Sequence, residues 1–585
     1  MAITIRSAVG RALTYGEADT NFSSIIHTVS QQGNDIAFTT LGGTTTIDVG
    51  LGNTTTAGGA FSHAEGAFTI ASGDYSHAEG YITRAQGPYS HAEGAYTTAS
   101  GDYSHAEGER TLAFGVLSHA EGYQTRASGA FSHAEGYQTL ASGVYSHTQG
   151  YLTTASKDGS HAEGINTKAN ADFAHAEGKG TIASGDYSHA EGELTVAFGP
   201  SSHAEGLQTR AIGGYSHTEG YLTTASAAGT HAEGAGTIAF ASYSHAEGDT
   251  TVTSGSYSHA EGRQTIASGS WSHAEGSQTI ASGDYSHTEG SDTTATKAGS
   301  HAEGLNTKAF NSFAHAEGKG TIASGYGSHA EGDLTVAFGT NSHAEGQYTR
   351  AQANYSHTEG VYTTASGDYS HAEGAGTRSS GSYSHAEGGS TIAQGPYSHA
   401  EGGYTTASRD YSHAEGYQTI ALGYASHTEG VYTTASGDYS HAEGYQTIAS
   451  GNYSHATGYQ TLASGTYSNT QGYLTTASLF GSHAEGKGTV ASGDFQHVQG
   501  IYNISSSIAG AFIHGNGTTD ANRSNLILAY DTVVEVTGSL RLKDILILAP
   551  RTTTPAPSPG MVIVSGSGAD QHIYCYLNST WKQLD

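Results

Sequence analysis

A 14-residue unit repeats through most of the chain without an insertion or a deletion. Stepping by 14 from residue 63 to residue 497 gives 32 positions, and 31 of them are histidine. Two residues later glutamate fills 28 of the units, and the next residue is glycine in all 32. A globular domain absorbs an extra residue in a loop, whereas in a stack of coils one slip displaces every later side chain. The strict period therefore predicts a solenoid.

The residues inside each unit favour β-structure. Small and larger side chains alternate with period 2, which is typical of strands. Glycines separate these alternating runs, which is typical of turns. Two strands of about five residues and two tight turns fill such a unit, whereas helical repeats need roughly 20 residues or more. We therefore expect an all-β parallel solenoid, or β-roll, of about 32 coils.

Strand parity assigns the side chains to an inner and an outer side. Ala64, Thr69 and Ala71 share the inner side, where only small residues fit, and His63 and Glu65 point outward. The outward face of the first strand hardly varies from coil to coil, which suggests that it packs against the same face of other copies. A homo-oligomer with its axis along the solenoid follows.

This reasoning predicts an axial ladder of histidine and glutamate. An axial face with 28 glutamates needs counter-charge, and only histidine occurs at a matching frequency. We therefore expect the carboxylates to raise the histidine pKa values, so that stability is lost as the pH rises through them. The residues chosen to represent the predicted ladder are His63, Glu65, His77, Glu79, His105, Glu107, His259, Glu261, His441 and Glu443.

Other uses of the histidine–glutamate pair are weighed against this structural one. Catalysis requires a unique pocket, which some thirty nearly identical copies do not provide, so we expect no enzyme. Three histidines around a threefold axis could hold a metal ion, with His63, His77 and His91 as weak candidates, but a salt-bridge ladder is favoured. Ice binding is disfavoured because the regular threonines, such as Thr69, point inward. No other cofactor is expected.

Composition excludes several further classes. The 585-residue chain has a formal net charge of −31, which argues against nucleic acid as a partner. Cys575 is the single cysteine, so no intrachain disulfide can form. The sequence contains no run of 18 apolar residues and no signal-peptide core at its start, so we expect neither membrane insertion nor a secretory leader.

The repeat resembles the head repeat of trimeric autotransporter adhesins, the YadA-like β-roll. Ser62-His63-Ala64-Glu65-Gly66 matches the core of that family's 14-residue coil, and Thr69 and Ala71 match its two spaced small residues. The segment 48–52, Asp-Val-Gly-Leu-Gly, is closer still because apolar residues replace histidine and glutamate. The resemblance covers about 48–505 and implies a left-handed parallel β-roll that forms a homotrimer.

The two ends resemble those of phage tail fibres. The segment 10–22 is similar to the opening of many tail-fibre and virion proteins, which implies attachment through Leu13, Tyr15 and Phe22 to a tail or baseplate protein. The last segment resembles a small β-rich tip module. Aromatic faces stack on sugar rings, so Tyr574, Tyr576 and Trp581 are candidate contacts to a host cell-surface glycan or protein.

The expected function is that of a structural and receptor-binding tail fibre in the virion of a bacteriophage, or of a related contractile particle. The alternative is a bacterial surface adhesin, with a metal-storing or ice-binding solenoid less favoured. The expected parts are an attachment segment (1–47), the β-roll shaft (48–507), a β-rich neck (508–550) and the tip module (551–585).

Overall fold

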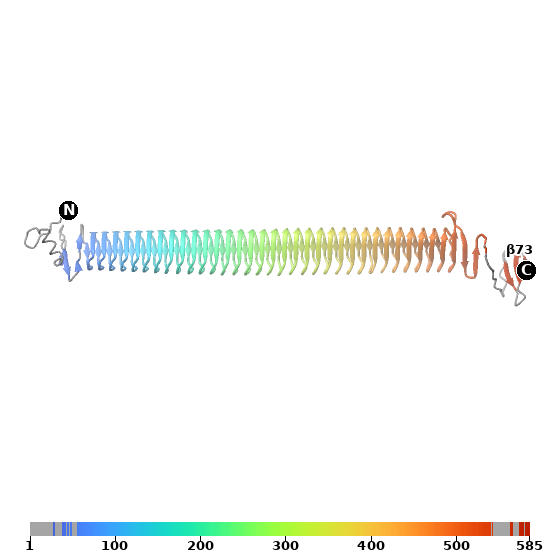
Figure 1. Ribbon diagram of the computed structural model, residues 1–585, viewed down its shortest axis with the longest axis horizontal. Helices are drawn as coiled ribbons and strands as arrows, with labels where there is room; N and C mark the ends of the chain where they lie inside the picture. The colour runs from blue at the N-terminus through green and yellow to red at the C-terminus, as the bar shows by residue number, and fades with distance from the viewer. Residues whose placement is uncertain are drawn as a thin grey trace, which may run out of the picture. The chain divides into compact units, whose positions relative to one another are not determined.

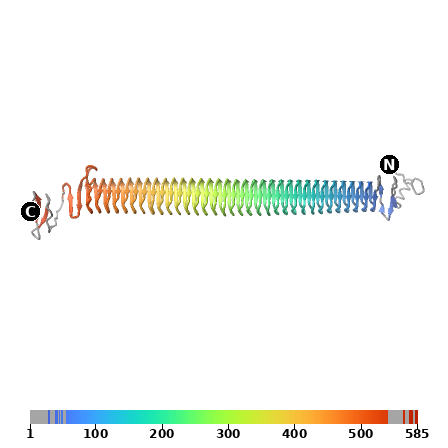
Figure 2. The same cartoon turned by 180° about the vertical axis from the view of Figure 1, so that it is seen from behind.

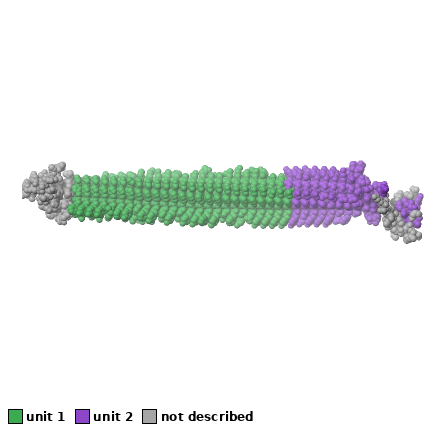
Figure 3. Space-filling model, viewed as in Figure 1, with its two compact units in different colours: residues 1–401 green, residues 402–585 purple. Residues whose placement is uncertain are grey.

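The computed structural model contains strands and turns, and no helix occurs among the residues that it describes (Figure 1). The described residues are 27–29, 38–41, 44–45, 47–49, 55–539, 541, 562–565, 572–577 and 580–584. Residues 1–401 and 402–585 form two compact units, coloured separately in Figure 3, and each is described by itself. The predicted attachment residues Leu13, Tyr15 and Phe22 lie outside the described residues.

Each 14-residue unit forms one coil with two strands. The first coil has β6 (His63–Ala67) and β7 (Ile70–Ala71), and the second begins with β8 (His77–Tyr81). β6 and β8 are parallel and in register, with His63 opposite His77. The prediction of an all-β parallel solenoid is confirmed. The second strand is shorter than expected, with two residues in place of about five.

The same register continues through both units. In residues 1–401 the five-residue strands run from β6 to β52 (His385–Gly389), and the two-residue strands run from β7 to β53 (Ile392–Ala393). In residues 402–585 they run from β56 (His413–Tyr417) to β68 (His497–Ile501), and from β55 (Thr406–Ala407) to β67 (Val490–Ala491). Figure 2 shows the stacked strands from behind.

The interior of the coils before residue 496 contains only small side chains, as parity predicted. Ser62, Ala64, Thr69 and Ala71 are at most 2% exposed. The Ser62 hydroxyl donates a hydrogen bond of 2.8 Å to the carbonyl of Gly59, which closes the turn before the strand. The two sheets of a coil are therefore joined by methyl and hydroxyl groups, and a single coil buries little apolar surface.

The invariant glycine of each unit has a steric cause. Gly66 has φ of +111°, a backbone conformation that side chains disfavour. A Cβ added there would lie 2.0 Å from the carbonyl oxygen of Gly80 in the next coil. Backbones of successive coils thus touch at this column, which explains why glycine fills all 32 positions.

The residue two positions before each ladder position, which is aromatic in 23 of the 32 units, lies in a left-handed turn. Tyr75 and Tyr89 have φ of 59° and 60°, which costs about 1–2 kcal/mol per residue. Their ring centres lie 4.8 Å apart with an interplanar angle of 3°. A stacked ring pair of this kind contributes about 0.5–1.5 kcal/mol, which offsets part of the cost of the left-handed backbone. The strand starts at the histidine itself, so the aromatic residue precedes the strand.

Larger residues close the coil stack at its C-terminal end. Gln496 and Asn503 occupy positions that hold serine and threonine in other coils, and both are fully buried. The Arg523 guanidinium donates hydrogen bonds of 2.7 and 3.1 Å to the carbonyls of Gly488 and Asn503. These contacts satisfy backbone groups that the next coil would otherwise pair.

Further strands follow this end. β69 (Phe512–Asn516) pairs in parallel with β68, whereas β70 (Asn525–Tyr530) is antiparallel to β69. The other strands outside the coils are β71 (Val533–Val536), β72 (Val562–Ser565), β73 (His572–Leu577), β74 (Thr580–Gln583), β1 (His27–Val29), β2 (Phe38–Leu41) and β3 (Thr44–Thr45). At the N-terminal end of the stack, β4 (Ile47–Val49) and β5 (Thr56–Ala57) pair in parallel with β6 and β7 and continue the coils.

The glycine column can be tested with two matched substitutions. Gly234 has φ of +109°, and an added Cβ would lie 2.0 Å from the Gly248 carbonyl oxygen, whereas at Gly389 nothing lies within 4 Å. We expect Gly234→Ala to lower the free energy of unfolding by about 2 kcal/mol or more, and Gly389→Ala to change it by less than about 0.5 kcal/mol. Denaturant titration followed by circular dichroism measures both, and equal effects would contradict the steric explanation.

Candidate functional site

The most uniform surface of the chain is the outward face of the five-residue strands. It consists of the histidine that begins each strand and the glutamate two residues later, here called the ladder. Side chains of His63 and Glu65 are 35% and 47% exposed, so the face is half-buried within a single chain. All ten representative ladder residues lie on this outward face, in β6, β8, β12 (His105–Glu109), β34 (His259–Arg263) and β60 (His441–Tyr445).

The ladder histidines stack on one another. The rings of His91 and His105 lie 4.7 Å apart with an interplanar angle of 1°, and the next pair, His105 and His119, repeats this geometry at 3°. Stacking shields the ring edges from water. The Nε2 atoms of His105 and His119 are buried and have no hydrogen-bond partner within the chain. The same holds in most described coils, so a row of polar atoms lacks partners.

Each histidine also faces the glutamate of its own coil. The Nε2–Oε2 distance is 3.6 Å for His63 and Glu65, 3.9 Å for His105 and Glu107, and 3.7 Å for His259 and Glu261. These distances exceed the 2.7–3.2 Å of a hydrogen bond. The pair is therefore close enough for electrostatic attraction but is not bonded within one chain.

The structure of the single chain overturns the expected protonation of the histidines. Burial lowers the pKa of His77 and His259, and the neighbouring ladder histidines lower it further, against the opposing effect of the glutamates. The same causes lower the pKa of His119 and His441 to about 4. Ring-on-ring stacking removes water from the imidazole and places cation beside cation, so the neutral form is favoured at pH 7.

One chain does not provide good metal geometry along the ladder. Ligand atoms of His105, Glu107 and His119 lie within 4.8 Å of one another. Zinc binds imidazole nitrogen at about 2.0–2.1 Å along the ring plane, so two coordinating nitrogens must converge on one point. Parallel rings 4.7 Å apart point their nitrogens in the same direction. His77 and His91 stack in this way, and His63 meets His77 edge-on at 75°, so the weak metal candidates remain a prediction.

Backbone pairing between neighbouring five-residue strands is interrupted in several coils whose inner alanine is replaced by threonine. At Thr218 the usual inner alanine becomes threonine, which is fully buried. β26 (His203–Leu207) and β28 (His217–Tyr221) pair at Ala204–Thr218 and again at Leu207–Tyr221. The two residues between these pairs are unpaired in each strand. Glu219 becomes exposed. Thr288 and Thr358 repeat the effect, whereas the coils of Thr148 and Thr470 stay fully paired with the coils before them.

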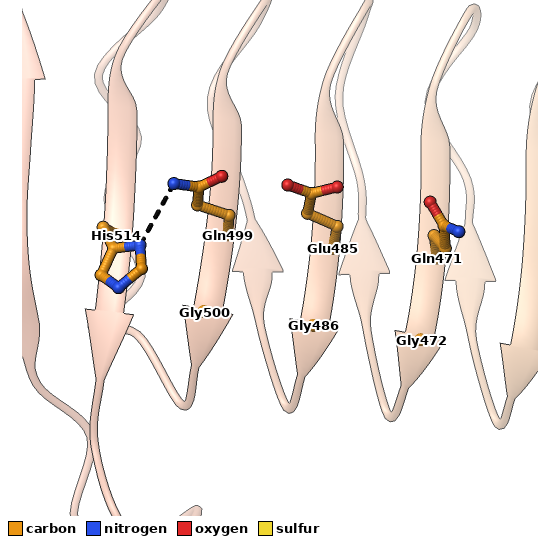
Figure 4. A pocket seen from close by; sticks show the side chains of 7 residues that line it. All are labelled: Gln471, Gly472, Glu485, Gly486, Gln499, Gly500 and His514. Carbon is orange, nitrogen blue, oxygen red and sulfur yellow. Dashed lines mark hydrogen bonds between the residues drawn. The ribbon is translucent and has the colours of Figure 1, made fainter.

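A groove that the sequence reasoning missed lies where the ladder changes composition (Figure 4). Gln471 and Gln499 replace glutamate on either side of Glu485, whose two carboxylate oxygens lie 3.8 Å and 3.6 Å from the Nε2 atoms of His483 and His497. The Gln499 amide donates a 3.2 Å hydrogen bond to Nδ1 of His514. The substitutions were visible in the sequence, but their common groove depends on the register of β69.

The predicted tip aromatics lie on a small antiparallel sheet. Tyr576 of β73 is opposite Trp581 of β74, and their rings meet at 5.3 Å and 60°. Tyr574 lies on the same side of β73, one strand period away, and the buried Cys575 points to the other side. All three aromatics are partly exposed, so their geometry allows a surface contact without establishing one.

The lowered pKa values predict that acid destabilises the chain. An unfolded histidine has a pKa near 6.5, whereas folded His245 and His315 have values of about 4. Between these pH values the unfolded state binds more protons, so stability is greatest above about pH 6.5 and is lost as the pH falls toward 4. Thermal melting followed by circular dichroism should show a lower midpoint at pH 5 than at pH 7.5.

A matched variant checks that the histidines cause this effect. Asparagine replaces histidine naturally at Asn469, so His231→Asn, His245→Asn and His259→Asn together should fold and should reduce the loss on acidification. A midpoint that rises on acidification, or a variant with unchanged pH dependence, would contradict the role of histidine burial.

Comparison with known protein families agrees with the coil geometry. The YadA head domain repeat matches residues 92–118, 176–202, 190–216, 260–286, 316–342, 330–349, 414–440 and 442–468. No curated protein matches the chain significantly. Every family match begins at the alanine that follows a ladder histidine, in the register of the coils. The coil stack of this chain therefore contains YadA head domain repeats at many positions, which indicates an adhesin-like fibre.

Proposed function

We propose that the chain forms a homotrimeric tail fibre of a bacteriophage or a related contractile particle. The segment 1–47 attaches the fibre to the tail or baseplate, 48–507 is the shaft, 508–550 is the neck and 551–585 recognises a host surface. The YadA head repeats support an adhesin-like fibre, and the tail-fibre resemblance of segment 10–22 supports the particle. This fibre is extracellular after release of the virion. No helix among the described residues is long and apolar enough to cross a membrane.

The observation that carries the trimer is the row of unpartnered imidazole nitrogens. A buried polar atom without a partner costs about 1–3 kcal/mol, and the cost recurs in coil after coil, for example at His105, His119 and His133. A turn of the ring toward a neighbouring chain would let a neutral imidazole donate its N–H to a carboxylate there. Three ladders that face a common axis thus supply the missing partners, with neutral histidines in place of the salt bridges that the sequence suggested.

The oligomeric state and its dependence on the ladder are testable together. Light scattering of the full chain should give the mass of three chains. Glu247→Lys with Glu261→Lys should lower the melting midpoint of the trimer, because cations would replace the hydrogen-bond acceptors in two of its layers. Ile266→Lys with Ile280→Lys places the same two lysines on the opposite sheet, where Lys168 and Lys308 occur naturally, and should leave the trimer intact. A monomeric or dimeric wild type would refute the axial ladder.

The proposed host contact depends on the aromatics of the tip. Trp581 and Tyr576 lie on neighbouring strands, and their rings meet edge to face. An exposed aromatic face of this kind suits stacking on a sugar ring. We expect Trp581→Ala to weaken binding of the full chain to bacterial-surface glycans by about tenfold. Lys582 lies on the other side of the same strand, opposite Cys575, so Lys582→Ala is a control that should retain binding. A glycan array measures both, and equal losses would argue against the aromatic contact.

The alternative function is that of a bacterial surface adhesin, which the family match supports equally well. Electron microscopy with an antibody against the C-terminal segment distinguishes the two locations. Label on particle tails supports the tail fibre, and label on cell envelopes without particles would favour the adhesin.

A further inference from the structure

The sheet opposite the ladder has an unusual charge distribution. Its outward side chains lie seven and nine residues after each ladder histidine, and in residues 63–401 they define what we call the basic face. Neither position holds an aspartate or glutamate in any of these coils, although the chain as a whole carries 53 acidic residues. The cations of the basic face are Arg84, Arg126, Lys168, Arg210, Lys308, Arg350 and Arg378.

These cations are available for a partner. Arg84, Arg126 and Arg210 are exposed, each at the start of a two-residue strand. Among the described residues the ion pairs of lysine and arginine involve Lys179, Arg409 and Arg523, none of which belongs to the basic face. The face therefore carries positive charge without an internal counter-charge, on a chain whose net charge is −31.

The cations are regularly spaced. Arg84, Arg126, Lys168 and Arg210 follow one another every 42 residues, which is every third coil. At the 4.7 Å separation of neighbouring coils, this spacing is about 14 Å along the stack. Lys308 and Arg350 repeat the interval. A partner that follows the stack would thus meet one cation at each step.

Exposed phenylalanines accompany the cations. Phe114 and Phe198 are 40% and 44% exposed at the ninth position, and each precedes by 12 residues an arginine in the next coil. The Arg126 guanidinium lies 5.0 Å from the centre of the Phe114 ring and donates a 2.8 Å hydrogen bond to the Ser128 hydroxyl. Phe338 and Arg350 repeat the sequence pattern. The recurring unit is an aromatic face, a cation and a hydroxyl.

We propose that the basic face binds an acidic polysaccharide that runs along the coils. Anionic groups of the polymer pair with the spaced cations, sugar rings stack on the phenylalanines, and serine and threonine hydroxyls bond sugar hydroxyls. An acidic polysaccharide carries at most one carboxylate per sugar, so its charges are spaced more widely than those of a nucleic acid, whose phosphates recur every 3.4 Å per strand. The acidic ladder on the other sheet would repel an anionic polymer, but salt screens this repulsion because the Debye length is about 8 Å at physiological ionic strength.

The surface is specific to the first compact unit. In residues 402–501 the same two positions hold Thr, Ile, Leu, Val and Ser, without a cation. The proposed binding therefore does not depend on the tip or on the phage assignment. It predicts a second attachment surface on the shaft, nearer the N-terminal end of the sequence.

The test compares two variants of the full chain with equal charge changes. In the face variant, Arg84→Gln, Arg126→Gln, Lys168→Gln and Arg210→Gln are combined. In the control, Lys157→Gln, Arg263→Gln, Lys297→Gln and Lys319→Gln remove four exposed cations that lie outside the face. Polygalacturonate is the acidic probe and dextran the neutral one, with affinities measured by titration calorimetry at 0.15 M salt and thermal melting as the check of folding.

We expect the wild type to bind polygalacturonate and not dextran. The face variant should bind the acidic polymer about tenfold more weakly or less, and the control within about twofold of the wild type. Phe114→Ser with Phe198→Ser should also weaken binding, and serine is the common natural residue at that position. Absence of polygalacturonate binding, or equal losses in the two charge variants, would overturn the proposal. Equal or tighter binding to oligothymidylate or to anionic lipid vesicles would overturn it too.

Discussion

The contact between backbones at the glycine column is the constraint on which the rest of the structure depends. Gly66 approaches Gly80 so closely that no side chain fits between them, and the same approach recurs in successive coils. This contact fixes both the separation and the register of neighbouring coils. An inserted residue would displace the column and bring a Cβ against a carbonyl, which accounts for the absence of insertions over the whole repeat. Every other ladder of side chains inherits its regularity from this contact.

Stability then comes from contacts between coils and only weakly from within them. The interior holds serine, alanine and threonine, which bury little apolar surface per coil. The turn at Tyr75 is strained, with a left-handed backbone that costs about 1–2 kcal/mol, and the stacked ring of Tyr89 offsets a similar amount. A ring inside the stack has two neighbours, so the stacking energy gained per strained turn rises with the number of coils. This is expected for a repeat protein, whose stability comes largely from the interfaces between repeats.

The sequence period predicted the solenoid, the inner position of Ala64 and Thr69, and the outward position of His63 and Glu65, because parity and register follow directly from a period of 14. The state of the histidines could not be predicted in the same way. Glu65 is two residues from His63 along the chain, so attraction seemed dominant. In the structure the ring of His77 stacks on that of His91 at 4.7 Å, and burial together with like charge outweighs the carboxylates. The short second strand and the left-handed aromatic turn likewise depend on how the coil closes, which a period does not specify.

The positions that vary within the repeat are those that the stack leaves free. The glycine column, the inner side chains and the ladder each contact their own copies in the next coil, so a change there disturbs two neighbours. The seventh and ninth positions after histidine point to solvent from a two-residue strand and accept Ile, Thr, Leu, Phe or Arg without altering the register. Random variation at such positions in an acidic chain should include acidic residues, yet in residues 63–401 all seven charged residues at these positions are cations. The fold does not require this bias, and the anionic partner proposed for the face would account for it.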